Sequence, residues 1–412
     1  MRRDWWVPVA CGAVILTIGI GARQSFGIFQ KPIADDLQVG RELWSFGNAL
    51  SMLLMGVLAP FVGGVERRFG VARTVAAGGV LYVLGMVVIG VATEGVLLTV
   101  GNALTGVGMA AAGFGPILAA INRAAPPDKR SLALGITTAG GSFGQFAVVP
   151  FASILLERLG SWHGTILILT AVSAVMIPLA LGLRETRSAP AAAGGAVAPQ
   201  GLREALSEAF ATPGFWLLTL GFFVCGFHVS FVGLHLPPYI SDKSVGMEVL
   251  GRSISPTELG GWAIALVGLF NIAGAILWGW LGGRHRRKDM LVLLYFLRAV
   301  AFIVFLALPL SAASVLLFAA TLGFLWLGTV PLTSGLVALM FGPTYMSMLY
   351  GIVFFSHQVG SFLGGWGGGR LYDLQGSYDL MWWISIGLGL FAALINWPIR
   401  EAPAARLAAR PA

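Results

Sequence analysis

Charged residues are scarce in this sequence. Only 11% of its 412 residues are Asp, Glu, Lys or Arg, and 57% are hydrophobic, whereas soluble globular chains carry about 25% charged residues. The composition therefore excludes an ordinary soluble protein and indicates one that lies in a lipid bilayer. The net charge of +8 is a membrane-topology signal, and no nucleic-acid partner is expected.

Cysteine is also rare, and several site types are missing. Cys11 and Cys225 both fall within apolar runs, so neither a disulfide framework nor a metal site is predicted. No cofactor is expected, and the lack of a Walker-type phosphate loop argues against ATP as the energy source. There is no cluster of nucleophile and base and no sizeable soluble domain, which disfavours a membrane enzyme or a sensor.

Long apolar runs dominate what is present. Each is close to the roughly 20 residues that a helix needs to cross about 30 Å of hydrocarbon. Only helices satisfy their backbone hydrogen bonds internally in runs of this kind, so an all-α membrane protein is predicted. The twelve expected spans are residues 6–33, 43–64, 72–92, 96–121, 132–156, 163–183, 213–239, 260–282, 290–309, 312–338, 346–369 and 379–399.

Basic residues are divided unevenly between the connecting segments. If each span reverses the chain, 18 of the 26 Lys and Arg residues fall on the side of the two termini and six on the opposite side. Arg23 and Arg298 remain within spans. Because cytoplasmic loops carry the excess of positive charge, both termini are predicted to be cytoplasmic.

The apolar pattern is interrupted at residues 185–211. A Pro-, Ala- and Gly-rich stretch there is typical of a flexible linker, and residues 202–210 are expected to form a short amphipathic helix on the membrane surface. We therefore predict an N-terminal six-helix bundle at 1–184, a cytoplasmic linker at 185–211, a C-terminal six-helix bundle at 212–400 and a cytoplasmic tail at 401–412.

The two predicted bundles share short sequence matches in the same order. The matching pairs, at offsets of 205, 215 and 216 residues, are Gly21 and Gly226, Arg23 and His228, Pro32 and Pro237, Gly113 and Gly328, Pro116 and Pro331, and Gly144 and Gly360. Any one match is weak in glycine-rich apolar sequence. Together they indicate an internal duplication, which in transporters places the substrate between the repeats near the bilayer midplane.

The segment after span 43–64 resembles the cytoplasmic loop signature of the major facilitator superfamily, Gly-x-x-x-Asp-Arg-Phe-Gly-x-Arg-Arg. The candidate residues of this motif are Gly63, Glu66, Arg67, Arg68, Gly70 and Arg73. Arg67 stands where the family has Asp, with Glu66 one place earlier. Two roles therefore remain open for this motif, a conformational latch or a solvated basic loop. The resemblance implies the major facilitator fold, with twelve transmembrane helices in two pseudo-repeated six-helix bundles.

Within this superfamily, the chain is similar to bacterial relatives of the monocarboxylate and oxalate/formate porters. The similarity rests on the segments that begin at Arg23, Pro127 and Gly160. It implies a multi-pass protein of the bacterial cytoplasmic (inner) membrane. Those porters carry an Arg near the positions of Asn271 and Ala275, and this chain has none there, so any anion anchor must lie elsewhere.

Acidic residues are missing from the membrane interior. All 18 Asp and Glu residues lie in connecting segments or at span ends, whereas Arg23 lies about halfway through span 6–33. A charge at this depth costs at least about 2.5–3.5 kcal/mol. Because Arg captures carboxylates with two parallel hydrogen bonds, we predict that Arg23 binds an anionic substrate. The alternative is that it bonds backbone carbonyls or reaches the membrane surface.

Histidines are the candidates for proton coupling. His228 and His357 both lie mid-span, and His is the side chain whose charge changes near neutral pH. Each is a candidate substrate contact and proton relay, or else a neutral residue that joins two helices. His235 is about 10 Å along the helix from His228, which excludes a shared metal ion.

Amides and one aromatic residue complete the candidate site. In lipid-buried bundles such amides either touch substrate or link helices, and Trp326 is the aromatic candidate for the cavity. The amides within spans are Gln24, Asn48, Asn102, Gln145, Asn271 and Gln358. Arg298 is expected to be structural and to snorkel to the cytoplasmic surface.

Glycines recur every fourth residue in two spans. Gly140 and Gly144 lie in one of them, and Gly360, Gly364 and Gly368 in the other. Such faces let helix backbones approach closely. They are expected either to slide between the two bundles or to pack statically.

The sequence thus predicts a secondary transporter that moves a small organic anion, a monocarboxylate, by alternating access. Symport and antiport both remain open, with protons as a candidate second substrate. The alternative function is efflux of a hydrophobic or zwitterionic compound. Besides substrate and protons, the lipid bilayer is the expected partner, and a monomer is expected.

Overall fold

The computed structural model describes residues 5–126, 129–184, 201–249, 252–342 and 345–404. Almost all of this part of the chain is helical. The N-terminal half consists of α1 (Trp6–Gln24), α2 (Phe26–Leu37), α3 (Arg41–Phe69), α4 (Val71–Gly90), α5 (Gly95–Ala112), α6 (Phe114–Ala124), α7 (Arg130–Leu159), α8 (Trp162–Ala174), α9 (Met176–Leu179) and the 3-10 helix η1 (Ala180–Leu183).

The C-terminal half follows a short helix, α10 (Leu202–Ala211), at the position where an amphipathic helix is expected. Residues 185–200 of the expected linker lie outside the described residues. The C-terminal half consists of α11 (Pro213–Asp242), β1 (Met247–Val249), β2 (Arg252–Ile254), α12 (Pro256–Arg284), α13 (Arg287–Ala307), α14 (Ala312–Phe324), α15 (Thr329–Phe341), α16 (Met346–Gln375) and α17 (Asp379–Asn396).

The predicted spans correspond to these helices. Among the described residues, eleven helical stretches are long and apolar enough to cross a membrane. The predicted span at 346–369 corresponds to α16, a 30-residue helix that carries polar residues such as His357, Gln358 and Asp373. The fold is therefore the predicted one, an all-α membrane protein of two six-helix bundles. A hairpin of two three-residue antiparallel strands, β1 and β2, was not expected.

Several spans are broken within their length, which the sequence analysis did not anticipate. Span 96–121 breaks at Gly113, the residue before α6, and span 312–338 breaks at residues 325–328, with Gly328 before α15. These glycines are a matching pair of the internal repeat, as are Pro116 and Pro331. Proline in the first turn of the second segment lacks the N–H that a continuous helix requires. The duplication therefore extends to the positions of these breaks.

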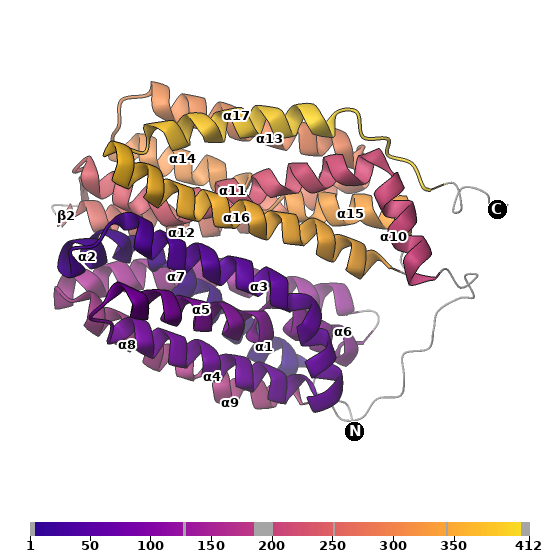
Figure 1. Ribbon diagram of the computed structural model, residues 1–412, viewed down its shortest axis with the longest axis horizontal. Helices are drawn as coiled ribbons and strands as arrows, with labels where there is room; N and C mark the ends of the chain where they lie inside the picture. Colours follow the sequence, from indigo (N-terminus) through magenta and orange to yellow (C-terminus); the bar gives the residue numbers. More distant parts are fainter. Residues whose placement is uncertain (1–4, 127–128, 185–200, 250–251, 343–344, 405–412) are drawn as a thin grey trace.

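The two halves lie side by side along most of their length (Figure 1). Each half has its own apolar core, one around Phe29, Tyr82 and Ile166 and others around residues such as Phe302 and Leu336. The chain ends and α10 lie at one end of the molecule, and α2 and β2 at the other (Figure 1). We call the end with α2 and β2 the outer end and the other the inner end.

The glycine-rich faces of α7 and α16 do not lie at the interface between the two halves. Gly140 and Gly144 of α7 lie against the backbone of α1, and Gly360 and Gly364 of α16 lie against the backbone of α11. Each face therefore packs within its own half, which supports the static role and contradicts the sliding one. A different glycine of α16, Gly365, faces Ala49 of α3 in the opposite half.

Candidate functional site

A small cavity lies between the two halves near mid-membrane. Its volume is about 30 Å³, enough for one or two water molecules. α1, α2 and α3 line it from the N-terminal half, and α11 from the C-terminal half. The lining residues are Arg23, Gln24, Gly27, Asn48, Met52, Val229, Ser230, Gly233 and Leu234.

Arg23 lies beside a local irregularity of the first span. The Ser25 Oγ donates to the carbonyl of Ala22 at 2.6 Å, but its N–H still donates to the carbonyl of Gly21 at 3.2 Å, and α2 continues the same span. Arg23 lies in the last turn of α1, about 26 Å along the span from Trp6.

The Arg23 side chain has no partner of its own. No hydrogen bond or ion pair between Arg23 and another residue is found within the described part of the chain. It is only half-buried, and it faces the cavity rather than the membrane surface. Its donors are therefore available to a ligand, and neither carbonyl bonding nor snorkelling uses them.

Three other polar side chains line the same cavity with few or no partners. Asn48 is 8% exposed, and its Nδ2 has no hydrogen-bond partner among the described residues. Ser230 Oγ lies 3.3 Å from the thioether sulfur of Met52, which is a weak acceptor. No hydrogen bond of the Gln24 side chain to a described residue is found. The cavity therefore offers one cation and several neutral hydrogen-bonding groups.

Gln358 and His357 lie next to this cavity and connect it to the C-terminal half. Gln358 Nε2 donates to the carbonyl of Met52 at 2.8 Å, so it links α16 to α3. The His357 Nδ1 lies 3.0 Å from Gln358 Oε1. His357 is stacked on Phe354 with a centroid distance of 5.6 Å. The structure thus brings Gln358 to the edge of the site, whereas His357 packs against Phe222 and Phe354 and reaches the site only through Gln358.

His228 points away from the cavity, although its repeat mate Arg23 lines it. The His228 Nε2–H donates to the Ser385 carbonyl at 2.8 Å, and the ring packs against Phe302 at 5.0 Å. It is fully buried within the C-terminal half. The structure therefore does not place His228 with the substrate-facing residues.

Two of the predicted amides link the halves at a second place. Gln145 Nε2 donates to the Ile264 carbonyl at 3.1 Å, and Asn271 Nδ2 donates to Ser142 Oγ at 2.9 Å. Both bonds join α7 to α12. These residues hold the interface together and do not line the cavity.

Asn102 and Trp326 are also placed outside the cavity. Asn102 Nδ2 donates to the Leu98 carbonyl of its own helix at 2.9 Å. Trp326 is 2% exposed and packs in the core of the C-terminal half. Neither residue is among those that line the cavity.

The prediction that Arg298 snorkels to the cytoplasmic surface is wrong. It is fully buried, and its Nε and Nη2 donate to the Leu325 carbonyl at 3.0 and 2.6 Å. Nη2 also donates to the carbonyl of Trp326. These carbonyls lie where α14 ends at mid-membrane and lack helical partners, so the side chain turns inward to cap the break.

A dense polar network closes the outer end. Arg41, 6% exposed, makes two bonds of 2.6 Å to Asp242 of the opposite half. The Arg41 guanidinium also lies 3.8 Å from the Tyr372 ring and 3.0 Å from the Tyr378 hydroxyl. Burial raises the pKa of Tyr378 above its ordinary value, so its hydroxyl remains neutral. We call Arg41, Glu42, Asp242, Arg370 and Asp373 the outer latch.

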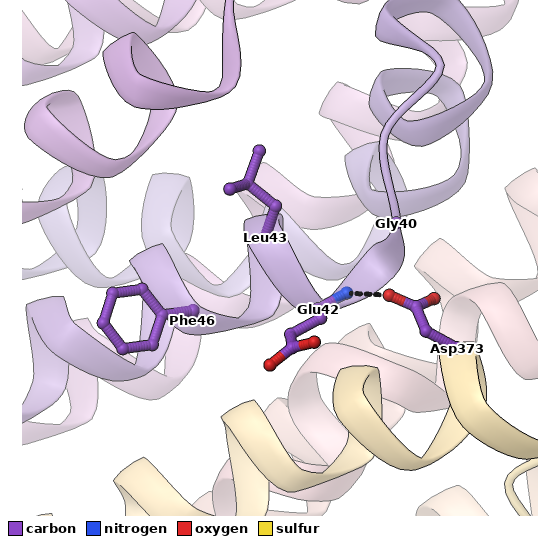
Figure 2. Close-up of a pocket in the computed structure, with 5 residues that line it drawn as sticks. All are labelled: Gly40, Glu42, Leu43, Phe46 and Asp373. Atoms are coloured by element: carbon purple, nitrogen blue, oxygen red, sulfur yellow. Dashed lines mark hydrogen bonds between the residues drawn. The ribbon is translucent and has the colours of Figure 1, made fainter.

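Asp373 of α16 caps a helix of the other half. Its two carboxylate oxygens accept the backbone N–H groups of Arg41 and Glu42 at 2.9 and 2.8 Å, at the start of α3. Figure 2 shows the bond from Glu42. Glu42 in turn accepts from Arg370 at 2.8 Å. Glu42 and Asp373 border an open pocket of about 390 Å³. Sequence reasoning placed all of these charges in connecting segments or at span ends and missed their pairing.

The loop motif at the inner end forms a contact within one half. Glu66, beside the position where the family has Asp, pairs with Arg123 at the end of α6. Arg67, Arg68 and Arg73 are exposed. Gly70 joins α3 to α4 with a φ of +83°, a conformation that favours glycine. Gly63 lies near the Arg67 side chain.

Comparisons with known proteins agree with this architecture. The family model of the Major Facilitator Superfamily matches residues 9–252 and 244–412. The solved structure of a bacterial homolog of the human lysosomal transporter Spinster, inward-facing and unoccupied, superimposes with a TM-score of 0.72 and 16% sequence identity. The match covers 96% of this chain and 94% of that one, and it shows the shared fold.

Several relatives match this chain along most of their length. An uncharacterized MFS-type transporter of Bacillus subtilis (strain 168), YcxA, is 27% identical over 404 residues, covering 92% of this chain and 91% of that protein. Monocarboxylate transporter 12 of Mus musculus is 26% identical (91% and 81% covered), and the oxalate:formate antiporter of Oxalobacter formigenes is 23% identical (87% and 83% covered). This chain belongs to the Major Facilitator Superfamily, whose members are membrane transporters and not enzymes.

Proposed function

We propose that this protein is a secondary transporter of a small organic anion, a monocarboxylate, and that Arg23 binds the carboxylate. The observation that carries the proposal is the unpartnered guanidinium in a cavity that both halves line. An uncompensated charge in a low-dielectric interior is costly. A carboxylate that forms two parallel hydrogen bonds with the guanidinium would supply the missing counter-charge.

The relatives support the same substrate class. Two of them are described as a monocarboxylate transporter and an oxalate:formate antiporter, and both descriptions name carboxylates. The cavity offers a single cation, because His228, the repeat mate of Arg23, lies inside the C-terminal half. One cation favours a ligand with one negative charge over a dianion.

The contacts between the halves support alternating access. The hydrogen bonds that cross between described residues of the two halves lie in the outer latch and at mid-depth, for example at Gln358 and Asn271. A Cβ on Gly27 would lie 2.6 Å from the Gly233 carbonyl, so α2 and α11 are in close backbone contact beside the cavity. The outer side is therefore closed, and substrate would enter or leave from the inner end.

The orientation follows from charge. The inner end carries the basic last turns of α3, α6 and α12, with Arg67, Arg123 and Arg284. By the positive-inside rule this end faces the cytoplasm, in a bacterial cytoplasmic membrane with both termini inside. His357 is the candidate for proton coupling, because Gln358 connects it to the backbone beside the cavity.

Uptake by proteoliposomes tests the proposal. The purified protein is reconstituted, and entry of radiolabelled formate, acetate, glycolate and oxalate is measured for the wild type and for Arg23→Ala. Loss of a charge-assisted contact worth about 2–3 kcal/mol should reduce monocarboxylate uptake roughly 30–150-fold. Arg158→Ala, which removes an exposed arginine, serves as the control and should transport normally. Undiminished uptake of every accepted anion by Arg23→Ala would refute the proposal.

A further inference from the structure

Asn48 stands out among the polar residues of α3. Ser45 accepts a hydrogen bond from Gln30 Nε2 at 2.7 Å, and Ser51 Oγ lies 3.4 Å from Thr105 Oγ1. No hydrogen bond joins the Asn48 side chain to another residue in the described ranges. It is nevertheless 8% exposed. Leaving a buried amide unpaired costs about 1–3 kcal/mol. A hydrogen-bonding partner from outside the chain would remove this cost.

The position of Asn48 shows where that partner lies. Asn48 and Met52 are one helical turn apart on the same face of α3, and both line the cavity that contains Arg23. Ser230 of α11 faces the same space from the other half. A ligand held by Arg23 would therefore lie beside a carboxamide and a hydroxyl.

We propose that Asn48 is a specificity-determining residue that recognises a polar substituent next to the carboxylate of the substrate. This inference rests on the proposed function, because it takes the Arg23 cavity as the substrate site. The Arg23 guanidinium already offers the two parallel N–H donors that a carboxylate uses. The amide of Asn48 supplies both a donor and an acceptor, which match a hydroxyl group.

The expected consequence is selection against unsubstituted acids. A site built to hydrogen-bond a substrate hydroxyl discriminates against the analogue that lacks it, because the polar groups of the site are then left unpaired. Water in the cavity can meet the amide in the free protein, and a hydroxylated ligand replaces it. The wild type should therefore prefer a 2-hydroxy monocarboxylate to the same acid without the hydroxyl.

Glycolate and acetate test this inference, since they differ by one hydroxyl. Uptake of each is measured in proteoliposomes with the wild type, Asn48→Leu and Asn102→Leu. We expect Asn48→Leu to reduce glycolate uptake about tenfold while acetate uptake changes less than twofold. Asn102→Leu changes an amide that bonds within its own helix, so the glycolate-to-acetate ratio should stay that of the wild type.

Stability provides a second readout. Because Asn48 has no internal partner, Asn48→Leu should unfold in detergent at the wild-type temperature or above it, whereas a structural role would lower that temperature. An unchanged glycolate-to-acetate ratio in Asn48→Leu would overturn the inference, even if Arg23→Ala abolishes uptake. Normal uptake by Arg23→Ala would instead overturn the proposed function. Transport of neither acid by the wild type would overturn both.

Discussion

Arg23 and Arg298 are two arginines within membrane-spanning helices of opposite halves, and their surroundings differ. Arg23 lies in α1 two residues before Ser25, and Arg298 lies in α13 beside the end of α14. Arg298 is fully buried and donates to backbone carbonyls of residues 325 and 326. Arg23 is half-buried and has no protein partner within the described part of the chain.

The difference shows that depth alone does not identify a ligand-binding arginine. The cost of a charge in hydrocarbon must be offset in either case. At Arg298 the carbonyl dipoles at a helix C-terminus provide the compensation. At Arg23 the chain leaves most of the donors free, so the compensation is left to water or a substrate. Whether the donors are already occupied separates a structural arginine from a functional one.

Removing the Arg298 guanidinium should have the largest effect on stability. Arg298→Met leaves the Leu325 and Trp326 carbonyls unpaired at mid-membrane, and we expect the free energy of unfolding to fall by about 3 kcal/mol. Denaturant unfolding in detergent micelles, followed by tryptophan fluorescence, measures it. Wild-type stability in this variant would show that the carbonyl contacts contribute nothing.

Lysine at the two positions should sharpen the contrast. An ammonium group lacks the planar fork that serves two carbonyls, so Arg298→Lys should lose about 1.5 kcal/mol of stability with its uptake per folded molecule unchanged. Arg23→Lys keeps the charge but loses the bidentate geometry, and uptake should fall about tenfold with stability unchanged. Measuring both properties on the same preparations gives the test. If the two variants exchanged these phenotypes, the assignment of roles would be reversed.

The smallest expected effect is on the stability of Arg23→Met. Replacing an uncompensated buried charge with an apolar side chain of similar length should leave the free energy of unfolding unchanged or raise it by about 1 kcal/mol. Uptake should be lost in the same sample. A drop comparable to that of Arg298→Met would mean that Arg23 is a structural residue as well.

The fold could be predicted from the sequence because span length and charge distribution are local properties. The twelve apolar runs correspond to helices, with ends that differ by a few residues. The break at residues 325–328 was not predicted, since it depends on tertiary contacts such as those of Arg298. Gly113 and Gly328, a matching pair of the internal repeat, each lie at a break in a span, but the match alone did not indicate a break.

The candidate site could be predicted only in part. Arg23 could be singled out because a charge within an apolar run is visible in the sequence. Arg23 and Gln24 both line the cavity. The repeat match predicted His228 as the counterpart of Arg23, but His228 bonds the Ser385 carbonyl inside the C-terminal half. Asn48 could not be distinguished from Asn102, because the presence of a partner is a three-dimensional property.

The Asp373 carboxylate completes the first turn of a helix that belongs to the other half. Moving the halves apart at the outer end would uncover those two N–H groups and expose them to the external solution. Small anions there can bind such a helix start and would help to keep the outer side open. The balance between the two states should therefore respond to the salt composition of the solution at the outer end, independently of the transported substrate.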